Sequence, residues 1–149
     1  FNEKDLVISD TNSRVGNFTY TPPDMITTPP AKNIDVSKAE ISFTLLEKDY
    51  TDVVKAAHQL QLPDVVATGD GTTINLIATD IKNTTSNVFS CNVGETSDNF
   101  KMIFRTENLR FMSGDYDVRI SSKGVGHFKN QSRELEYWVA TEADSSYDA

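Results

Sequence analysis

One segment of the chain has the hydrophobic spacing of an amphipathic helix. Between Leu45 and Leu62, apolar residues recur at the i, i+3, i+4 and i+7 positions of one helix face, and polar side chains occupy the opposite face. Glu47 and Asp49 fall in the first turn, where carboxylates interact favourably with the helix dipole. Pro63 follows directly and cannot continue a helix. The pattern therefore predicts one long helix in this part of the chain.

Most of the remaining chain has the period-two alternation of β-strands. The segments with this pattern are DLVISD, RVGNFTY, AEISFTLL, the hairpin VVATGDGTTINLIATD, NVFSCNV, NFKMIFR, DYDVRISS, GHFKN and ELEYWVATE. A second, short helix is predicted at Glu107–Met112, because Thr106 can cap its first turn and Ser113–Gly114 can end it. From Ala39 onward, both halves of the chain then follow the order strand, helix, three strands. This order indicates an internal structural repeat of about 50 residues.

The repeat predicts an α+β fold of two βαβββ units, with the helices side by side on one face of antiparallel sheets. Residues 1–20 predict a separate hairpin, which needs a further surface to pack on because a lone hairpin is marginal in water. Residues 21–38 contain four of the five prolines and have no periodicity, so an extended connector is expected there. Met25 and Ile26 are isolated apolar residues in this connector. It is either a plain surface linker or a segment that borders a binding site.

Composition and charge narrow the classes of protein. The 149 residues suit one domain, or one domain and a fragment of another. No apolar run approaches the roughly 18 residues of a membrane-spanning helix. The first residue is Phe and no secretory signal is present, so the chain is expected to be a piece of a longer protein or a processed product. The single cysteine favours a reducing, intracellular setting.

A net charge of −8 argues against a protein whose whole surface binds a polyanion, but it permits a local basic strip. Lys48 and Lys55 are seven residues apart and therefore lie on one face of the long helix. Arg110, and with it Arg105, is expected on the neighbouring helix. Such a pair of helices is suited to contacting phosphates without reading bases. The alternative is an ordinary solvated helix face, since acidic residues outnumber basic ones on the first helix.

No catalytic or metal-binding set is found in the sequence. It lacks a phosphate-binding glycine loop, a GxSxG elbow and an HExxH motif. His58 is interpreted as a boundary or polar-face residue of the helix, and His127 has no carboxylate next to it in sequence. Cys91 alternates with Phe89 and is interpreted as half-buried packing. We therefore expect a protein that is not an enzyme and has no cofactor and no metal.

The second half of the chain resembles a known family. The run NFKMIFRTENLRFMSGDYDVRISSKG, followed by LEYWVATEADSSYDA, is similar to the C-terminal part of the sliding clamp of T-even-type bacteriophages. The shared features are a strand, a short helix and a glycine before an aromatic residue (here Met112 to Tyr116), and an aromatic strand that ends in ATEADS (Ala140 to Ser145). Upstream, the proline-rich connector, the strand at Ile41 and the long helix also lie where that family has them.

The resemblance implies a DNA polymerase processivity factor with a DNA-clamp fold. Residues 1–20 would be the remnant hairpin of a preceding clamp domain, residues 21–38 the interdomain connector, and residues 39–149 a complete C-terminal domain. A full-length protein of this family forms a homotrimeric ring, and its helices face double-stranded DNA. Its other partners are the replicative DNA polymerase and an ATP-dependent clamp loader. The setting would be the cytoplasm of an infected bacterial host, with no membrane involved.

By the resemblance, Lys48, Lys55, Arg105 and Arg110 would face the DNA. The pocket for the partner's peptide would be formed by Met25, Ile26, Tyr137 and Val139. The main alternative from another class is a viral surface or adhesin β-domain that binds a receptor or glycan. That alternative explains the acidity and the strands, but it does not explain an amphipathic helix with a polar strip or the matched second half.

Overall fold

The computed structural model describes residues 5–9, 11, 15–26 and 38–148. The chain divides into two compact units, Phe1–Ile34 and Asp35–Ala149. In the first unit, β1 (Asp5–Ser9) pairs with β2 (Val15–Thr19) as an antiparallel hairpin, and a short 3-10 helix η1 (Pro23–Met25) follows. The hairpin confirms the two predicted strands. Most of the predicted connector, residues 27–37, lies outside the described residues.

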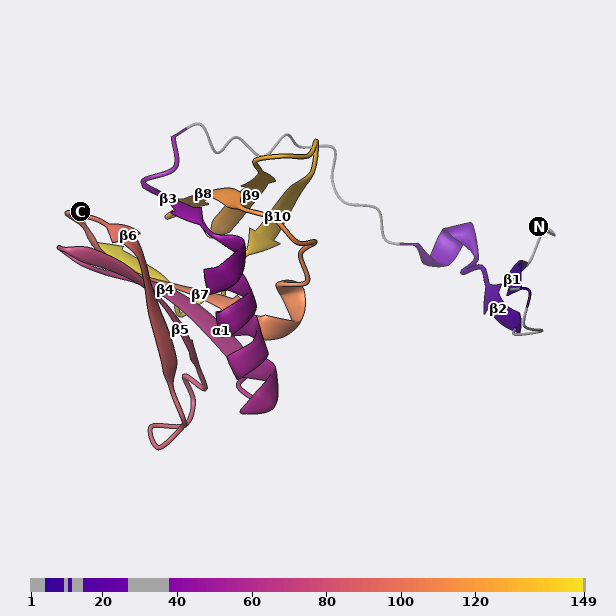
Figure 1. The fold of residues 1–149 in the computed structure, drawn as a ribbon, viewed down its shortest axis with the longest axis horizontal. Coiled ribbons are helices and arrows are strands. Elements are labelled where there is room, and N and C mark those ends of the chain that lie inside the picture. The colour runs from indigo at the N-terminus through magenta and orange to yellow at the C-terminus, as the bar shows by residue number, and fades with distance from the viewer. Residues whose placement is uncertain (1–4, 10, 12–14, 27–37, 149) are drawn as a thin grey trace. The chain divides into compact units, whose positions relative to one another are not determined.

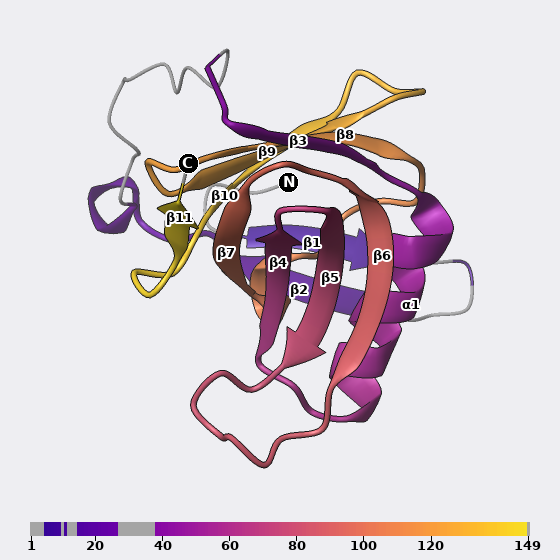
Figure 2. The same cartoon turned by 90° about the vertical axis from the view of Figure 1, so that its left-hand side faces the viewer.

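In its described residues, 38–148, the second unit contains two antiparallel sheets and one α-helix. The four-stranded sheet has the order β10-β9-β8-β3, and the five-stranded sheet has the order β11-β7-β4-β5-β6. The elements are β3 (Ile41–Leu45), α1 (Glu47–Gln59), β4 (Asp64–Asp70), β5 (Thr73–Thr79), β6 (Phe89–Glu95), β7 (Asn99–Arg105), η2 (Thr106–Asn108), β8 (Tyr116–Ser121), β9 (Val125–Asn130), β10 (Glu136–Ala140) and β11 (Ser146–Asp148). Figures 1 and 2 show α1 beside the five-stranded sheet, with β3, β8 and β9 in the second sheet.

The predicted repeat is present, and its two halves exchange strands. The first half is β3, α1 and β4–β6, and the second is β7, η2 and β8–β10. β3 pairs with β8 of the second half, and β7 pairs with β4 of the first half. Each half therefore places three strands in one sheet and one strand in the other. This exchange confirms the expected α+β fold of antiparallel sheets, with one difference at the second helix that is described below.

One hydrophobic core joins both sheets and α1. Alternate residues of β3 and β8 point into it, because period-two alternation directs every second side chain to the same face. The buried members include Ile41, Leu45, Val53, Ala57, Val65, Ala67, Ile74, Met102, Phe104, Tyr116, Val118, Ile120 and Phe128. Phe104 and Phe128, from different sheets, meet edge to face with their ring centroids 5.7 Å apart. Val53 and Ala57 join the apolar face of α1 to this core, and the polar face of the helix is left to solvent.

Candidate nucleic-acid interface

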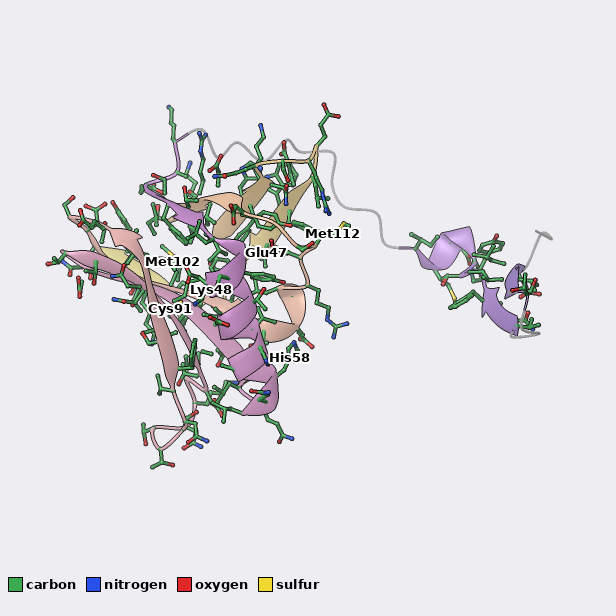
Figure 3. All side chains as sticks on the ribbon, viewed as in Figure 1. Glu47, Lys48, His58, Cys91, Met102 and Met112 are labelled. Atoms are coloured by element: carbon green, nitrogen blue, oxygen red, sulfur yellow. The ribbon has the colours of Figure 1, made fainter. Side chains whose placement is uncertain are left out.

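The outer face of α1 carries a line of polar and basic side chains. Lys48, Thr51, Lys55 and His58 are all exposed, and their spacing of three, four and three residues places them on one side of the helix. The Lys48 ammonium lies 2.9 Å from the Asp52 carboxylate one turn along the helix. This hydrogen bond, together with the charge of Asp52, raises the pKa of Lys48 above its usual value. Lys48 therefore stays charged. Figure 3 shows Lys48 and His58 near opposite ends of α1.

Both ends of α1 are fixed by specific hydrogen bonds. At the start, the Asp115 carboxylate accepts a hydrogen bond of 2.8 Å from the Glu47 amide, so a residue from the other half of the repeat caps the helix. At the end, Leu62 N donates to Ala57 O and Gln61 N donates to His58 O, which is a Schellman motif. Gln61 occupies the left-handed position with φ of 54°. The N-terminal cap thus ties the start of α1 to the second half of the domain, and the C-terminal motif ends the helix.

The second predicted helix, Glu107–Met112, is wrong. Only Thr106–Asn108 form a single 3-10 turn, and the chain then runs without helix to Gly114, where φ is +132°. The physical reason is that distant side chains bond the backbone of this short segment, in place of the bonds that a helix would make. We call residues 109–112 the tyrosine-held segment. Hydroxyls of Tyr50, Tyr116 and Tyr137 hydrogen-bond its backbone.

The tyrosine-held segment lies beside α1, as expected for the second helix. Leu109 is buried, and the Phe111 ring stacks on Tyr50 of α1 with a centroid distance of 5.5 Å. Arg110, between these two inward residues, is exposed. It lines an open groove of about 380 Å³ together with His58, at the C-terminal end of α1. The structure thus brings Arg110 next to His58, while Lys55 lines a separate groove together with Phe89.

Arg105 has a structural setting that the sequence did not indicate. It is the last residue of β7, not part of a helix. Its guanidinium lies 3.2 Å from the Asp64 carboxylate and 3.4 Å from that of Glu142. Asp64 is fully buried and also accepts a hydrogen bond of 3.1 Å from the Ile81 amide. The charge of Arg105 is therefore compensated within the domain, and its expected place on a helix beside Lys48 and Lys55 is wrong.

The four expected peptide-pocket residues have different surroundings. Met25 and Ile26 are exposed, with relative accessibilities of 72% and 55%. Val139 lies in the core, and Tyr137 stacks on Phe111 with a centroid distance of 4.5 Å. On β10 the exposed aromatic residue is Trp138, because the alternation turns it to the face opposite that of its two neighbours. The expected pocket role of Tyr137 and Val139 stays a prediction; in this structure both side chains face the core, and Trp138 is exposed.

The remaining residues considered for chemistry have structural roles. Cys91 is half-buried and packs against the core, and burial raises the pKa of its thiol, which the nearby Asp49 and Asp52 raise further. His127 is buried, stacks on Trp138, and has its Nε2 2.9 Å from the Glu136 carboxylate on the neighbouring strand. Glu136 is nine positions away from His127 in sequence and comes close to it because β9 and β10 are paired. Within the described ranges, no group of three or more His, Cys, Asp or Glu could hold a metal ion. No helix among the described residues is long and apolar enough to cross a membrane.

A βαβββ unit and a matching unit with a 3-10 turn in place of the helix exchange their first strands here, and the one amphipathic helix exposes a basic line. This arrangement is that of the DNA-clamp class of folds. A family model described as "gp45 sliding clamp, C terminal" matches residues 42–143. A curated sliding clamp of Vibrio phage KVP40 is 34% identical over an alignment of 149 positions. The alignment covers 96% of this chain and 66% of that protein. The chain belongs to the gp45 sliding-clamp family, as the resemblance of its second half predicted.

Solved structures show the same fold at low sequence identity. A DNA polymerase III beta-subunit sliding clamp from Bartonella birtlesii LL-WM9 matches with a TM-score of 0.59 and 14% identity over 94% of this chain and 40% of that one. The DNA polymerase III beta subunit of Borrelia burgdorferi matches with a TM-score of 0.54 and 11% identity over 96% of this chain and 39% of that one. The chain thus spans about two fifths of these structures and just under two thirds of the phage relative. These matches support the clamp fold and lend no support to an adhesin domain.

Proposed function

We propose that the protein works as part of a DNA polymerase sliding clamp, in a ring that encloses duplex DNA and holds the replicative polymerase near its template. The observation that carries this proposal is the family match over residues 42–143, on a domain whose α1 exposes a basic line away from its sheets. A ring is retained on DNA by its topology, so strong binding is unnecessary and would hinder sliding. A net charge of −8 with a weakly basic helix face is consistent with this mechanism.

We further propose a domain layout and partners by analogy with the family. Residues 1–20 would belong to a preceding clamp domain, residues 21–38 would be the interdomain connector, and residues 39–149 the C-terminal clamp domain. The partners would be other clamp subunits in a homotrimer, an ATP-dependent clamp loader and the replicative polymerase, in the cytoplasm of an infected bacterium. The clamp itself would perform no catalysis. Met25 and Ile26, both exposed in the described part of the connector, remain our candidates for contacting the polymerase.

Lys48, Lys55 and Arg110 are the proposed phosphate contacts. All three are exposed, and α1 and the tyrosine-held segment lie side by side. Asp52 reduces the local field at Lys48, which suits a weak contact. Arg105 is left out of this set because its charge is compensated by two carboxylates. Phosphate contacts of this kind position the duplex without reading its sequence.

The test is charge reversal of the three contacts. The triple variant Lys48→Glu, Lys55→Glu, Arg110→Glu should give shorter products in a single-turnover primer-extension assay with the cognate polymerase, clamp loader and a polymerase trap. Thermal unfolding should change little, because the three side chains are exposed.

A matched control changes the same number of charges elsewhere. Lys101→Glu, Lys123→Glu and Lys129→Glu replace exposed lysines on β7, on the β8–β9 turn and on β9. This control should keep product length near that of the wild type. Equal product lengths for the two triple variants would refute the assignment of α1 as the DNA-facing element.

A further inference from the structure

The tyrosine-held segment takes the place of the second helix, and side-chain hydroxyls replace the hydrogen bonds that a helix would make. Tyr116 Oη donates to Met112 O at 2.6 Å, and Tyr137 Oη accepts from Met112 N at 3.1 Å. Tyr50 Oη donates to Leu109 O at 2.8 Å and accepts from Phe111 N at 2.8 Å. The three tyrosines belong to α1, β8 and β10. The segment is therefore held from the four-stranded sheet, which contains β8 and β10, and from the helix.

Tyr50 differs from the other two tyrosines in what it holds. Its hydroxyl bonds the carbonyl of the residue before Arg110 and the amide of the residue after it. The two peptide groups on either side of Arg110 are thus fixed by one oxygen atom. The Tyr50 ring also stacks on Phe111, with an interplanar angle of 12°. Leu109 is buried and Phe111 is partly buried against the core, whereas Arg110 between them is exposed and lines the same groove as His58.

We infer that Tyr50 is a positioning residue for DNA contact, whose hydroxyl holds the backbone on both sides of Arg110 so that its guanidinium meets a phosphate of the duplex. This inference rests on the proposed function. A long arginine side chain on a mobile backbone would lose more conformational freedom on each contact than one on a fixed backbone. Tyr50 lies on the same helix as Lys48 and Lys55, so it also fixes Arg110 relative to these lysines.

The experiment is a double-variant cycle on duplex binding. Binding of the 149-residue chain to a short blunt duplex is followed by fluorescence anisotropy from low to moderate salt. Here the slope means the magnitude of the negative slope of log Kobs against log salt. Arg110→Ala should lower this slope by about 0.9, the value of one phosphate contact. Tyr50→Phe, which keeps the ring, should lower the slope by more than half as much. In the Arg110→Ala background, Tyr50→Phe should have no further effect, which a general loss of stability would not reproduce.

Two further variants make the cycle specific. Tyr147→Phe removes a hydrogen-bonded hydroxyl that contacts Asp98, away from the segment, and should leave the slope unchanged. Tyr137→Phe removes one bond beyond Arg110 and should change the slope less than Tyr50→Phe does. If Tyr50→Phe folds poorly, amide hydrogen exchange decides the matter. Faster exchange at Phe111 than in β4 and β7 supports the positioning role, and uniform acceleration overturns it.

The outcomes separate this inference from the proposed function. A reduced slope for Arg110→Ala with an unchanged slope for Tyr50→Phe would overturn the positioning role and leave the DNA-facing surface intact. An unchanged slope for Arg110→Ala would overturn Arg110 as a phosphate contact, and the inference with it. Absence of duplex binding at the lowest salt would count against the DNA-facing assignment of the whole α1 face.

Discussion

The ion pair between Asp64 and Arg105 allows a quantitative prediction for Asp64→Ala. The substitution removes the carboxylate that accepts from Arg105 at 3.2 Å and from the Ile81 amide at 3.1 Å. Leaving the partly buried Ile81 amide without this partner costs about 1 kcal/mol, the lower end of the range for a buried donor. Removing one partner of a fully buried ion pair costs about 3–5 kcal/mol. The cost is smaller here, because the Arg105 side chain is 31% exposed and still has its ion pair with Glu142. We expect a total loss of about 3 kcal/mol.

For a domain of this size, that loss should lower the midpoint of thermal unfolding by roughly 12 °C. Circular dichroism at neutral pH is a sufficient assay. Glu142→Ala is the matched control, because it removes the other, more exposed carboxylate at 3.4 Å and should cost less than about 1 kcal/mol. A midpoint for Asp64→Ala as close to the wild type as that of Glu142→Ala would refute the reasoning. Asp64 would then contribute no more than a surface charge.

Two other predictions concern the core and the tyrosines. Val139→Ala should cost about 2 kcal/mol in urea unfolding, because Val139 is buried, whereas Lys129→Ala on the neighbouring strand should cost almost nothing; equal costs would contradict the core position. Burial raises the pKa of Tyr50 and Tyr116, so the folded state favours the neutral form of each phenol. The stability that this preference contributes is complete below about pH 10, and it is lost as the pH rises through the folded-state pKa. Alkaline unfolding curves should therefore be shallower for Tyr50→Phe, and an unchanged slope would exclude this coupling.

Much of the fold follows from local sequence patterns. The alternation of AEISFTLL and DYDVRISS identifies β3 and β8, and the 3.6-residue period before Pro63 identifies α1. The repeat of strand, helix and three strands was also visible from the order of these elements. What the pattern does not contain is the pairing of β3 with β8 and of β7 with β4, since alternation says which face of a strand is buried and not which strand lies beside it.

Two of the differences at the site, at the second helix and at Arg105, come from partners that are distant in sequence. The pattern of ENLRFM indicates a helix, but the Tyr50 hydroxyl, about 60 positions upstream, bonds the backbone of this segment and satisfies it in a non-helical conformation. Arg105 looks like a free cation until Asp64, on another strand, is placed beside it. The face of β10 could have been predicted, because the polar residue Glu136 sets the phase that turns Tyr137 and Val139 inward. The short β11 lacked enough residues to show a pattern.

The exchange of first strands between the two halves has a consequence for synthesis on the ribosome. β3 is made early, but its hydrogen-bonding partner β8 is made only after all of β4 to β7. The nascent first half can form α1 and the β4–β5–β6 meander. Until β8 is made, β3 has no hydrogen-bonding partner, and its apolar face stays exposed to solvent. Contacts between such distant residues slow folding and prolong the exposure of aggregation-prone edges. Folding of this domain is therefore expected to be completed late, in a single cooperative step after β8 leaves the exit tunnel.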